Sequence, residues 1–536
     1  MSAALQNPHF KQARKLVREG QLLPAIEAFE KALGELPNDP TILFELAQVA
    51  RQAEMLEIAI EMLRNTIKVT PGDAVVWRSL GLSQISAGRY EDAQQSFQQV
   101  IDLAGETPET LCDLATALQK SGKSKEAMQT RLKALSIKDN GFTALNGIAD
   151  HLAGLGQFKD SLTYYERADK AAKANSLESL QNRYNHGLAL LNAGRPIEGW
   201  ALHEARLHQK LRRVKYKHNI KAYKGQNLSG KRLLIMAEQG LGDQIEFASV
   251  INDVMGLARE VHICVEFRLM TLFQRSFPDA IVHTYNHKQT GYLRELTPIW
   301  RGGKKPMLDW AVPIGSLPYF FRKDPDNQRS DTPYLFADPE QREYWRQRLN
   351  DEVGHEKPIV GICWRSGRLS GDRWRHQSSL SEWKPILQRK GFTYVNLQYD
   401  ECKDEIAVAE KEIGTKIHNF DDLDQTVELD KTAAMISELD FVLSHGTVVS
   451  QLAGALGVPS IKFARSHLML GCQPMPLQPS VQPFWYGNKY DQANEKLLEF
   501  REQFRLPRDI VRTRYNTRTV NRVEFRRPDY LEEFDL

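Results

Sequence analysis

The sequence predicts an α-helical solenoid of repeats, followed by an α/β region made of two halves. Small residues recur every 34 residues through the first part of the chain, at helical spacing from other apolar residues. From about residue 231 onward, short apolar runs of strand length alternate with helical patterns, which is typical of a parallel sheet. At 536 residues the chain should form several domains, because one hydrophobic core rarely exceeds about 250–300 residues.

The repeats are expected over residues 1–212. Each unit has a small residue where two helices must cross closely: Ala25, Ala59, Ala93, Ala127 and Ser161. Five positions earlier stand glycines, which favour the left-handed conformation that ends a helix: Gly20, Gly88, Gly122 and Gly156, with Glu54 breaking the series. A sixth, looser unit contains Gly194 and Gly199.

This period and pattern resemble a tetratricopeptide array, whose units stack into a superhelix with a concave groove. Such a groove usually binds a peptide or protein segment. The alternative is a solenoid that only holds or dimerises the next domain, so a homo-oligomer formed through the repeats is a second expectation.

The first half of the α/β region is expected over residues 231–340, after a lysine-rich connector at 213–230. Its strands are predicted at 233–237, 261–265 and 281–283 and its helices at 244–257 and 268–277, with a loop-rich stretch after them.

The second half is expected over residues 341–485, and a helix at 340–349 is expected to link it to the first. Its strands are predicted at 358–364, 392–397 and 440–443, with helices at 381–389 and 427–439, and one further strand is opened by Pro459. Two such Rossmann-like halves imply a cleft that the carboxyl ends of both sets of strands face. The tail, residues 486–536, is expected to hold a helical stretch and an arginine-rich segment that packs across the halves.

Three loops follow predicted strands and are the candidates for chemistry. The first runs from Glu238 to Asp243, where Gly240 and Gly242 permit a tight turn and Gln244 supports the loop. Asp243 stands where a helix starts. It could act as a general base that takes a proton from an attacking hydroxyl. The alternative is a capping box, with Asp243 as the N-cap and Glu246 as its partner.

The second loop runs from Arg365 to His376 and is rich in arginine. Guanidinium groups suit the bidentate grip of a phosphate or carboxylate. The residues expected to bind phosphate are Arg365, Ser366, Gly367, Arg373, Arg375 and His376, and Trp374 could stack on a base. The alternative is a solvated basic loop.

The third loop is Ser444-His445-Gly446-Thr447, which precedes a helix of small residues. Its hydroxyls and the helix N-terminus could hold a phosphate or a ribose, because free backbone N–H groups attract anions there. Ordinary packing of helix on sheet is the alternative, and a lone histidine such as His445 is more often structural.

The loops together resemble the two-Rossmann-domain (B-type) glycosyltransferases, in particular the heptosyltransferase-like family of bacteria. Gly240-Leu-Gly-Asp243 matches the family's first loop, and residues 452–457 match its Leu-Ala-Gly-Ala-Leu-Gly helix. Bacterial proteins that join tetratricopeptide repeats to such a domain look similar further, at residues 275–278 and 316–318. The chain departs from the family where Gly446 replaces an aspartate and Gln451 replaces a histidine.

The resemblance implies transfer of a sugar from a nucleotide-sugar donor to a protein or peptide recruited by the repeats, with flagellin as one candidate acceptor. Asp243 would be the base of a direct, inverting displacement, and the donor would lie on the second half. Two alternatives remain open: a non-catalytic scaffold with a degenerate transferase domain, and a nucleotide-sugar epimerase on the same fold.

Composition sets the remaining expectations. A formal charge of +3 gives no reason to expect nucleic acid as a partner. The five cysteines are scattered and lack a Cys-x-x-Cys pair, which argues against a metal site or a disulfide framework and favours the cytoplasm. No stretch approaches the roughly 18 apolar residues of a membrane helix. Neither a metal nor a permanently bound cofactor is expected.

Overall fold

The computed structural model describes residues 3–238, 240–290, 293–324, 328, 330, 333–354, 356–367, 378–388, 391–464 and 476–485. The chain divides into two compact units, Met1–Ala153 with Asp160–Asn182 and Gly154–Lys159 with Arg183–Leu536. Several predictions fall outside the described residues: those for Arg373, Trp374, Arg375 and His376, and those for the tail at 486–536.

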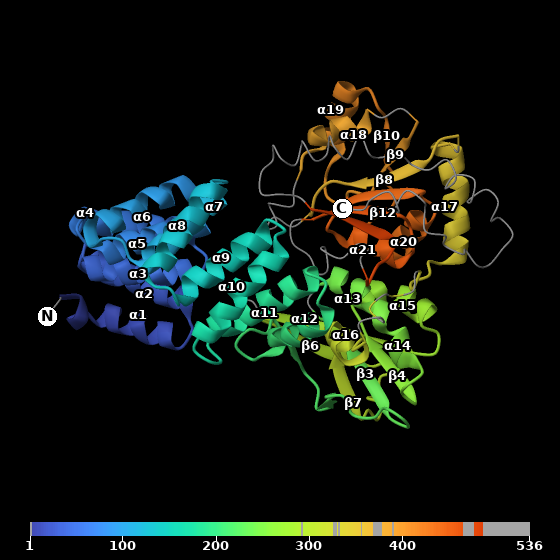
Figure 1. Ribbon diagram of the computed structural model, residues 1–536, viewed down its shortest axis with the longest axis horizontal. Coiled ribbons are helices and arrows are strands. Elements are labelled where there is room, and N and C mark those ends of the chain that lie inside the picture. The colour runs from blue at the N-terminus through green and yellow to red at the C-terminus, as the bar shows by residue number, and fades with distance from the viewer. Residues whose placement is uncertain are drawn as a thin grey trace. The chain divides into compact units, whose positions relative to one another are not determined.

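The first unit is a stack of antiparallel helix pairs (Figure 1). The pairs are α1 (Pro8–Arg18) with α2 (Leu22–Glu35), α3 (Pro40–Gln52) with α4 (Leu56–Val69), α5 (Ala74–Ser86) with α6 (Tyr90–Ala104), α7 (Pro108–Lys120) with α8 (Ser124–Ile137), and α9 (Phe142–Gly154) with α10 (Phe158–Ala171). The five small residues at the 34-residue period all lie on the second helix of a pair, and all are fully buried. The predicted repeat is therefore confirmed.

The turn inside each pair has a left-handed residue, as predicted. The glycines of the series have φ between +76° and +87°, at Gly20, Gly88, Gly122 and Gly156. Glu54, which interrupts the glycine series, has φ +63°. The turn geometry thus persists even where the residue type does not favour it.

A sixth helix pair forms from α11 (Leu177–Asn192) and α12 (Pro196–His203). Its helices approach closely at glycines, since a Cβ on Gly199 would overlap Leu191 and one on Gly187 would overlap backbone atoms of α12. The boundary between the compact units falls inside α11, after Asn182. The end of the sixth pair therefore groups with the α/β region and not with the first five pairs.

The first sheet has seven strands, in the order β1-β6-β5-β4-β3-β7-β2, and only the β5–β6 pair is antiparallel. Its strands are β1 (Val214–Tyr216), β2 (Lys221–Ala222), β3 (Arg232–Met236), β4 (Glu260–Cys264), β5 (Ile281–Thr290), β6 (Leu293–Ile299) and β7 (Trp310–Pro313). Its helices are α13 (Leu241–Phe247), α14 (Asn252–Met255), α15 (Met270–Ser276) and α16 (Leu317–Phe321).

Three expectations for this half are corrected. The segment taken as a connector supplies the edge strands β1 and β2. The loop-rich stretch after His283 is the long β5–β6 pair, whose few buried apolar side chains, such as Tyr285 and Leu296, hid it among polar residues. The helix expected at 244–257 is α13 and α14, separated by a short 3-10 turn at Ala248–Val250.

The second sheet is wholly parallel and has the order β10-β9-β8-β11-β12-β13. Its strands are β8 (Ile359–Cys363), β9 (Thr393–Asn396), β10 (Ile417–His418), β11 (Phe441–His445), β12 (Ser460–Ala464) and β13 (Val481–Trp485). Read in chain order, these six strands lie as 3-2-1-4-5-6, which is the doubly wound arrangement.

The helices of this half are α17 (Pro339–Glu352), α18 (Lys384–Leu387), α19 (Lys403–Ile413), α20 (Leu429–Ser437) and α21 (Val448–Ala455). The helix expected at 381–389 is a 3-10 turn at Leu380–Trp383 followed by α18, and the capping box of Ser379 with Glu382 is present. The sequence did not predict β10, β13 or α19.

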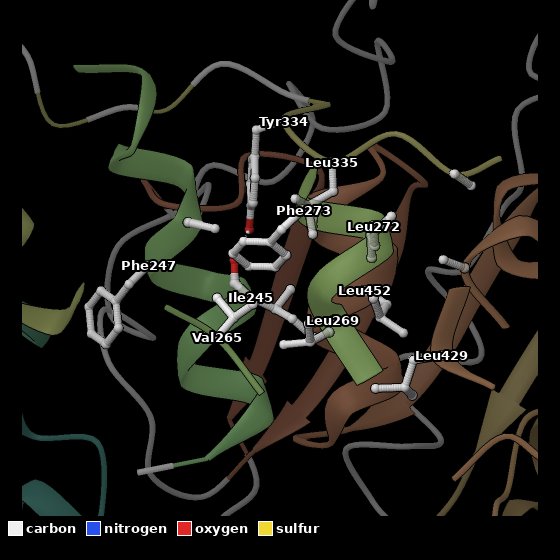
Figure 2. Close-up of a cluster of buried hydrophobic side chains, with 14 of the residues drawn as sticks. Ile245, Phe247, Val265, Leu269, Leu272, Phe273, Tyr334, Leu335, Leu429 and Leu452 are labelled. Carbon is white, nitrogen blue, oxygen red and sulfur yellow. Dashed lines mark hydrogen bonds between the residues drawn. The ribbon is translucent and has the colours of Figure 1, made fainter. Parts of the chain in front are cut away.

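The two halves share one apolar core. Figure 2 shows Ile245 of α13 and Phe273 of α15 in the same cluster as Leu429 of α20 and Leu452 of α21. Tyr334 joins this cluster, and its hydroxyl donates a hydrogen bond of 3.0 Å to the Ile245 carbonyl. The described helices include none that is long and apolar enough to cross a membrane.

Candidate functional site

Strand order marks two places where ligands bind in doubly wound sheets, namely where neighbouring strands lead their following loops to opposite sides. In the second sheet this point lies between β8, which is followed by the loop that starts at Arg365, and β11, which is followed by Gly446 and Thr447. The loop predicted at 444–447 is therefore shorter than expected, because β11 pairs with β12 through Ser444 and His445. In the first sheet it lies between β3 and β7, which are followed by the loops at Glu238 and Ile314. The described residues of the three loops singled out from the sequence therefore lie at these points.

The first-sheet point is filled by an ion-pair cluster that the sequence did not predict. Arg206, in the 3-10 turn Glu204–Leu207 after α12, donates two hydrogen bonds to Glu238, of 3.1 and 2.9 Å. It also bonds Ser316 Oγ at 2.9 Å and Glu204 Oε1 at 2.5 Å. Glu238 accepts the Gly315 N–H at 2.7 Å as well. Burial alone would lower the pKa of Arg206, but Glu238 and Glu204 raise it above its ordinary value.

Asp243 caps its helix, but not as the N-cap. Gly240 is the N-cap of α13, and Asp243 is the third helical residue, whose Oδ2 accepts the Gly240 N–H at 3.0 Å. The expected pairing of Asp243 as N-cap with Glu246 is therefore wrong, because the helix begins earlier, at Leu241. Asp243 is half-buried.

Gln244, which was expected to support the loop, is fully buried. Its amide donates to the Gly240 carbonyl and to the Tyr285 hydroxyl, each at 3.3 Å, and its oxygen accepts the Glu266 N–H at 2.9 Å. Gly242 lies against the other half, since a Cβ there would stand 3.5 Å from Cγ of Gln451. This loop is therefore held firmly between β3, β4 and α21.

The guanidinium of Arg365 bonds to carboxylates of its own half. Its Nε and Nη2 donate to the Asp400 carboxylate at 2.8 and 3.2 Å, and its Nη1 pairs with Glu405. Gly367 donates its N–H to the Tyr399 hydroxyl at 3.1 Å. Ser366, between Arg365 and Gly367 in the sequence, is half-buried. In this geometry Arg365 anchors the start of the loop, and its charge is balanced without a ligand.

The third loop lies beside the second, because the thiol of Cys363 on β8 is 3.6 Å from Thr447 Oγ1. Thr447 is the N-cap of α21 and accepts the Val449 N–H at 3.2 Å. The Gly446 N–H donates to the Phe463 carbonyl at 3.0 Å, and the Thr447 N–H donates to Ser450 Oγ at 3.2 Å. These loop amides are therefore already bonded within the chain.

His445 lies in a core on the other face of the sheet from Ser444. It is 3% exposed, its ring is close to Trp383 and Phe463, and its Nε2 is 3.1 Å from Ser378 Oγ. This surrounding favours the structural role over a direct role in binding.

A polar group between α13 and α21 also escaped the sequence analysis. Glu246 of α13 is 1% exposed and accepts a hydrogen bond of 2.9 Å from Gln451 Nε2 of α21. Gln478 donates to the Gln451 carbonyl at 2.8 Å and to the Tyr334 hydroxyl at 3.0 Å. Lys462 of β12 is fully buried nearby. The sequence signal for this buried lysine is its position among the apolar residues of the segment 458–463.

The described residues contain no group of three or more His, Cys, Asp or Glu side chains that could hold a metal ion. The four cysteines among them, Cys112, Cys264, Cys363 and Cys402, are free and buried.

Comparison with known proteins bears first on the helix pairs. The tetratricopeptide-repeat family profile matches residues 44–108. The chain carries tetratricopeptide repeats. Solved repeat structures are also similar: MamA protein at 21% identity, over 30% of this chain and 89% of that one, with a TM-score of 0.28, and PilW, a type IV pilus biogenesis factor, at 18% identity, over 39% and 96%, with a TM-score of 0.33.

Two curated relatives are similar over different lengths. Protein FlbA of Caulobacter vibrioides is 28% identical over 475 residues, which is 87% of this chain and 79% of FlbA. The repeat-containing protein YpiA of Bacillus subtilis is 30% identical over 136 residues, which is 25% of this chain and 32% of YpiA. A match of 475 residues is longer than the tetratricopeptide array, so the similarity to FlbA extends into the α/β region.

Proposed function

We propose that the chain is a B-type glycosyltransferase that moves a sugar from a nucleotide-sugar donor to a protein or peptide recruited by its repeats. One observation carries the proposal. The strand orders of the two sheets bring the loop at Asp243, the start of the loop at Arg365 and the junction of β11 with α21 to the kind of strand end where doubly wound sheets bind ligands. The hydrogen bond between Glu246 and Gln451 joins α13 and α21, the helices at the first and third of these places.

In the proposed reaction, the oxygen of an acceptor hydroxyl attacks the anomeric carbon of the donor sugar. The bond from that carbon to the phosphate oxygen breaks, and its electron pair leaves with the nucleotide. Asp243 takes the hydroxyl proton. Because the displacement is direct, the sugar is transferred with inversion. One oxygen of Asp243 accepts the Gly240 N–H, which fixes the direction of the carboxylate.

The role of Arg365 changes in this proposal. Because Asp400 and Glu405 balance its charge, we assign Arg365 to holding the loop in place, and the donor phosphate needs another cation. The carboxylate that contacts the donor or a cation in the heptosyltransferase-like family is missing here, because Gly446 stands at that position. The donor would therefore be held by protein groups alone.

The acceptor side rests on the repeats, because grooves of such arrays bind extended peptides. Flagellin remains one candidate acceptor, and a cytoplasmic reaction with nucleotide sugars is part of the proposal.

Asp243→Asn tests the base assignment. Asparagine keeps an oxygen that can accept the Gly240 N–H, so the helix cap should survive. Loss of a general base should lower transfer by about 10²–10⁴-fold. A thermal-shift screen with UDP-, GDP-, ADP-, dTDP- and CMP-linked sugars first identifies the donor, and transfer to the acceptor is then measured. Asp404→Asn, on the exposed first turn of α19, is the matched control. Full transfer by a folded Asp243→Asn protein would show that the base is another group.

A non-catalytic scaffold is the second candidate. Internal bonding of the Gly446 and Thr447 amides, together with the balanced charge of Arg365, favours it. The two candidates differ in the donor screen, because a scaffold of this kind would bind no nucleotide sugar.

A further inference from the structure

Lys462 is a buried cation beside the proposed donor loop. It lies on β12, is fully buried, and its ammonium has no hydrogen-bond partner among the described residues. In the parallel register it pairs with Ser444 of β11, so the two side chains lie on the same face of the sheet. Ser444 Oγ is 3.1 Å from Thr447 Oγ1, at the start of α21. Lys462 therefore lies on the side of the sheet where α21 begins.

Two acids of the first half act on Lys462. Asp243 and Glu246, both on α13, favour its charged form, while burial lowers the pKa of Lys462 to about 8. The other polar side chains around Glu246, namely Gln451, Gln478 and Tyr334, are neutral. Lys462 thus shares a sheet face with Ser444 and is influenced by the charges of both acids on α13.

An ammonium that is buried without an acceptor costs several kcal/mol, so such groups are usually paired or serve a ligand. The proposed transfer needs a cation at this place, because negative charge grows on the leaving phosphate oxygen as the bond to the sugar breaks. Arg365, which follows β8, is already balanced by Asp400 and Glu405.

We propose that the ammonium of Lys462 binds the phosphate oxygens of the leaving nucleotide. This inference rests on the proposed transferase function. The acceptor oxygen forms its bond to the anomeric carbon, the bond from that carbon to the phosphate oxygen breaks, and the proton goes to Asp243. Lys462 donates a hydrogen bond to the phosphate throughout and is left unchanged.

Inorganic pyrophosphate is the probe for this site, because it carries the phosphate chemistry without a base or a sugar. Binding to the full chain is measured by calorimetry for the wild type, for Lys462→Met and for Lys411→Met. Lys411 is an exposed lysine on α19, so its variant removes the same charge elsewhere. We expect the wild type and Lys411→Met to bind alike, and Lys462→Met to bind at least about tenfold more weakly, as for loss of a charged hydrogen bond.

The pH dependence gives a second readout that a purely structural lysine would not produce. Asp243 and Glu246 are the acids that face Lys462, and both favour its charged form. Pyrophosphate binding to the wild type should weaken as the pH rises above about 8, because Lys462 loses its proton. Lys462→Met should lack this decline.

The double variant Glu246→Gln/Lys462→Met guards against misfolding. Lys462→Met leaves the buried Glu246 without a nearby cation, and Glu246→Gln removes that uncompensated charge. The double variant should fold and bind pyrophosphate as weakly as Lys462→Met. The assignment is overturned if Lys462→Met or the double variant binds pyrophosphate as tightly as the wild type, or if the wild type does not bind pyrophosphate.

The outcomes also separate this inference from the proposed function. If a nucleotide sugar stabilises Lys462→Met as much as the wild type, Lys462 is not the phosphate ligand, and the transferase proposal stands. If pyrophosphate binding depends on Lys462 but no nucleotide sugar binds, the anion site stands, and the transferase proposal fails.

Discussion

Replacing Arg206 with methionine tests how strongly the end of the sixth helix pair stabilises the first sheet. The Arg206 and Glu238 side chains are each only 6% exposed. The change leaves Glu238 with the Gly315 N–H as its remaining hydrogen-bond donor in the described part of the chain. Breaking a buried ion pair by removing one partner costs about 3–5 kcal/mol, because the other charge stays buried.

For a folded unit of this size, about 1–2 °C of melting temperature is lost per kcal/mol, so Arg206→Met should lower Tm by about 3–10 °C. Differential scanning calorimetry of the full chain measures the shift. Arg212→Met, which removes an exposed arginine nearby, is the control and should change Tm by less than about 1 °C.

The double variant Arg206→Met/Glu238→Gln should recover part of the loss, because the unpaired charge is removed with its partner. If Arg206→Met has the same Tm as the wild type, the ion-pair cluster does not stabilise the sheet and the reasoning is refuted.

Two further predictions concern stability. Glu54→Gly should raise the free energy of unfolding by about 1 kcal/mol, because Glu54 has a left-handed φ of +63°. Gly88→Glu should lower the free energy of unfolding by about as much. Urea unfolding measures both changes, and a loss of stability in Glu54→Gly would contradict the argument. Burial, with help from His262 and Arg301, lowers the pKa of His283 to about 4, so the folded state prefers the neutral ring. Its contribution to stability is present above the ordinary value of 6.5 and is lost as the pH falls from 6.5 toward 4. Melting temperatures across that range should fall less steeply for His283→Gln, and equal slopes would exclude His283 as a source.

The helical repeats could be predicted because their signal is local and periodic. Each small residue at the 34-residue period is buried for the same reason, a close helix crossing, so five independent observations agree. The β5–β6 pair could not be predicted in this way. Residues 286–290 of β5 are all exposed, so no alternation of apolar and polar residues marks the strand. Its partner strand decides its conformation.

The candidate site divides along the same line. The positions of the first two loops follow from the ends of predicted strands, and the structure has strands ending before them, whereas β11 continues through Ser444 and His445. The partners of Arg365 lie 35 and 40 residues further along the chain, on segments whose packing the sequence does not reveal. For the same reason, Lys462 and Glu246 stand 216 positions apart and meet only once the halves pack together.

The edge strands of the two sheets affect how copies of the protein can associate. In the described part of the chain the outer strands are short at three edges, with β1, β2 and β10 spanning three, two and two residues. The fourth edge strand, β13, contains Pro483, which has no N–H to offer a neighbouring strand. Exposed strand edges are where chains polymerise through backbone pairing, and short or proline-bearing edges suppress it. These four edge strands are therefore poor templates for copies of this protein to extend one another's sheets.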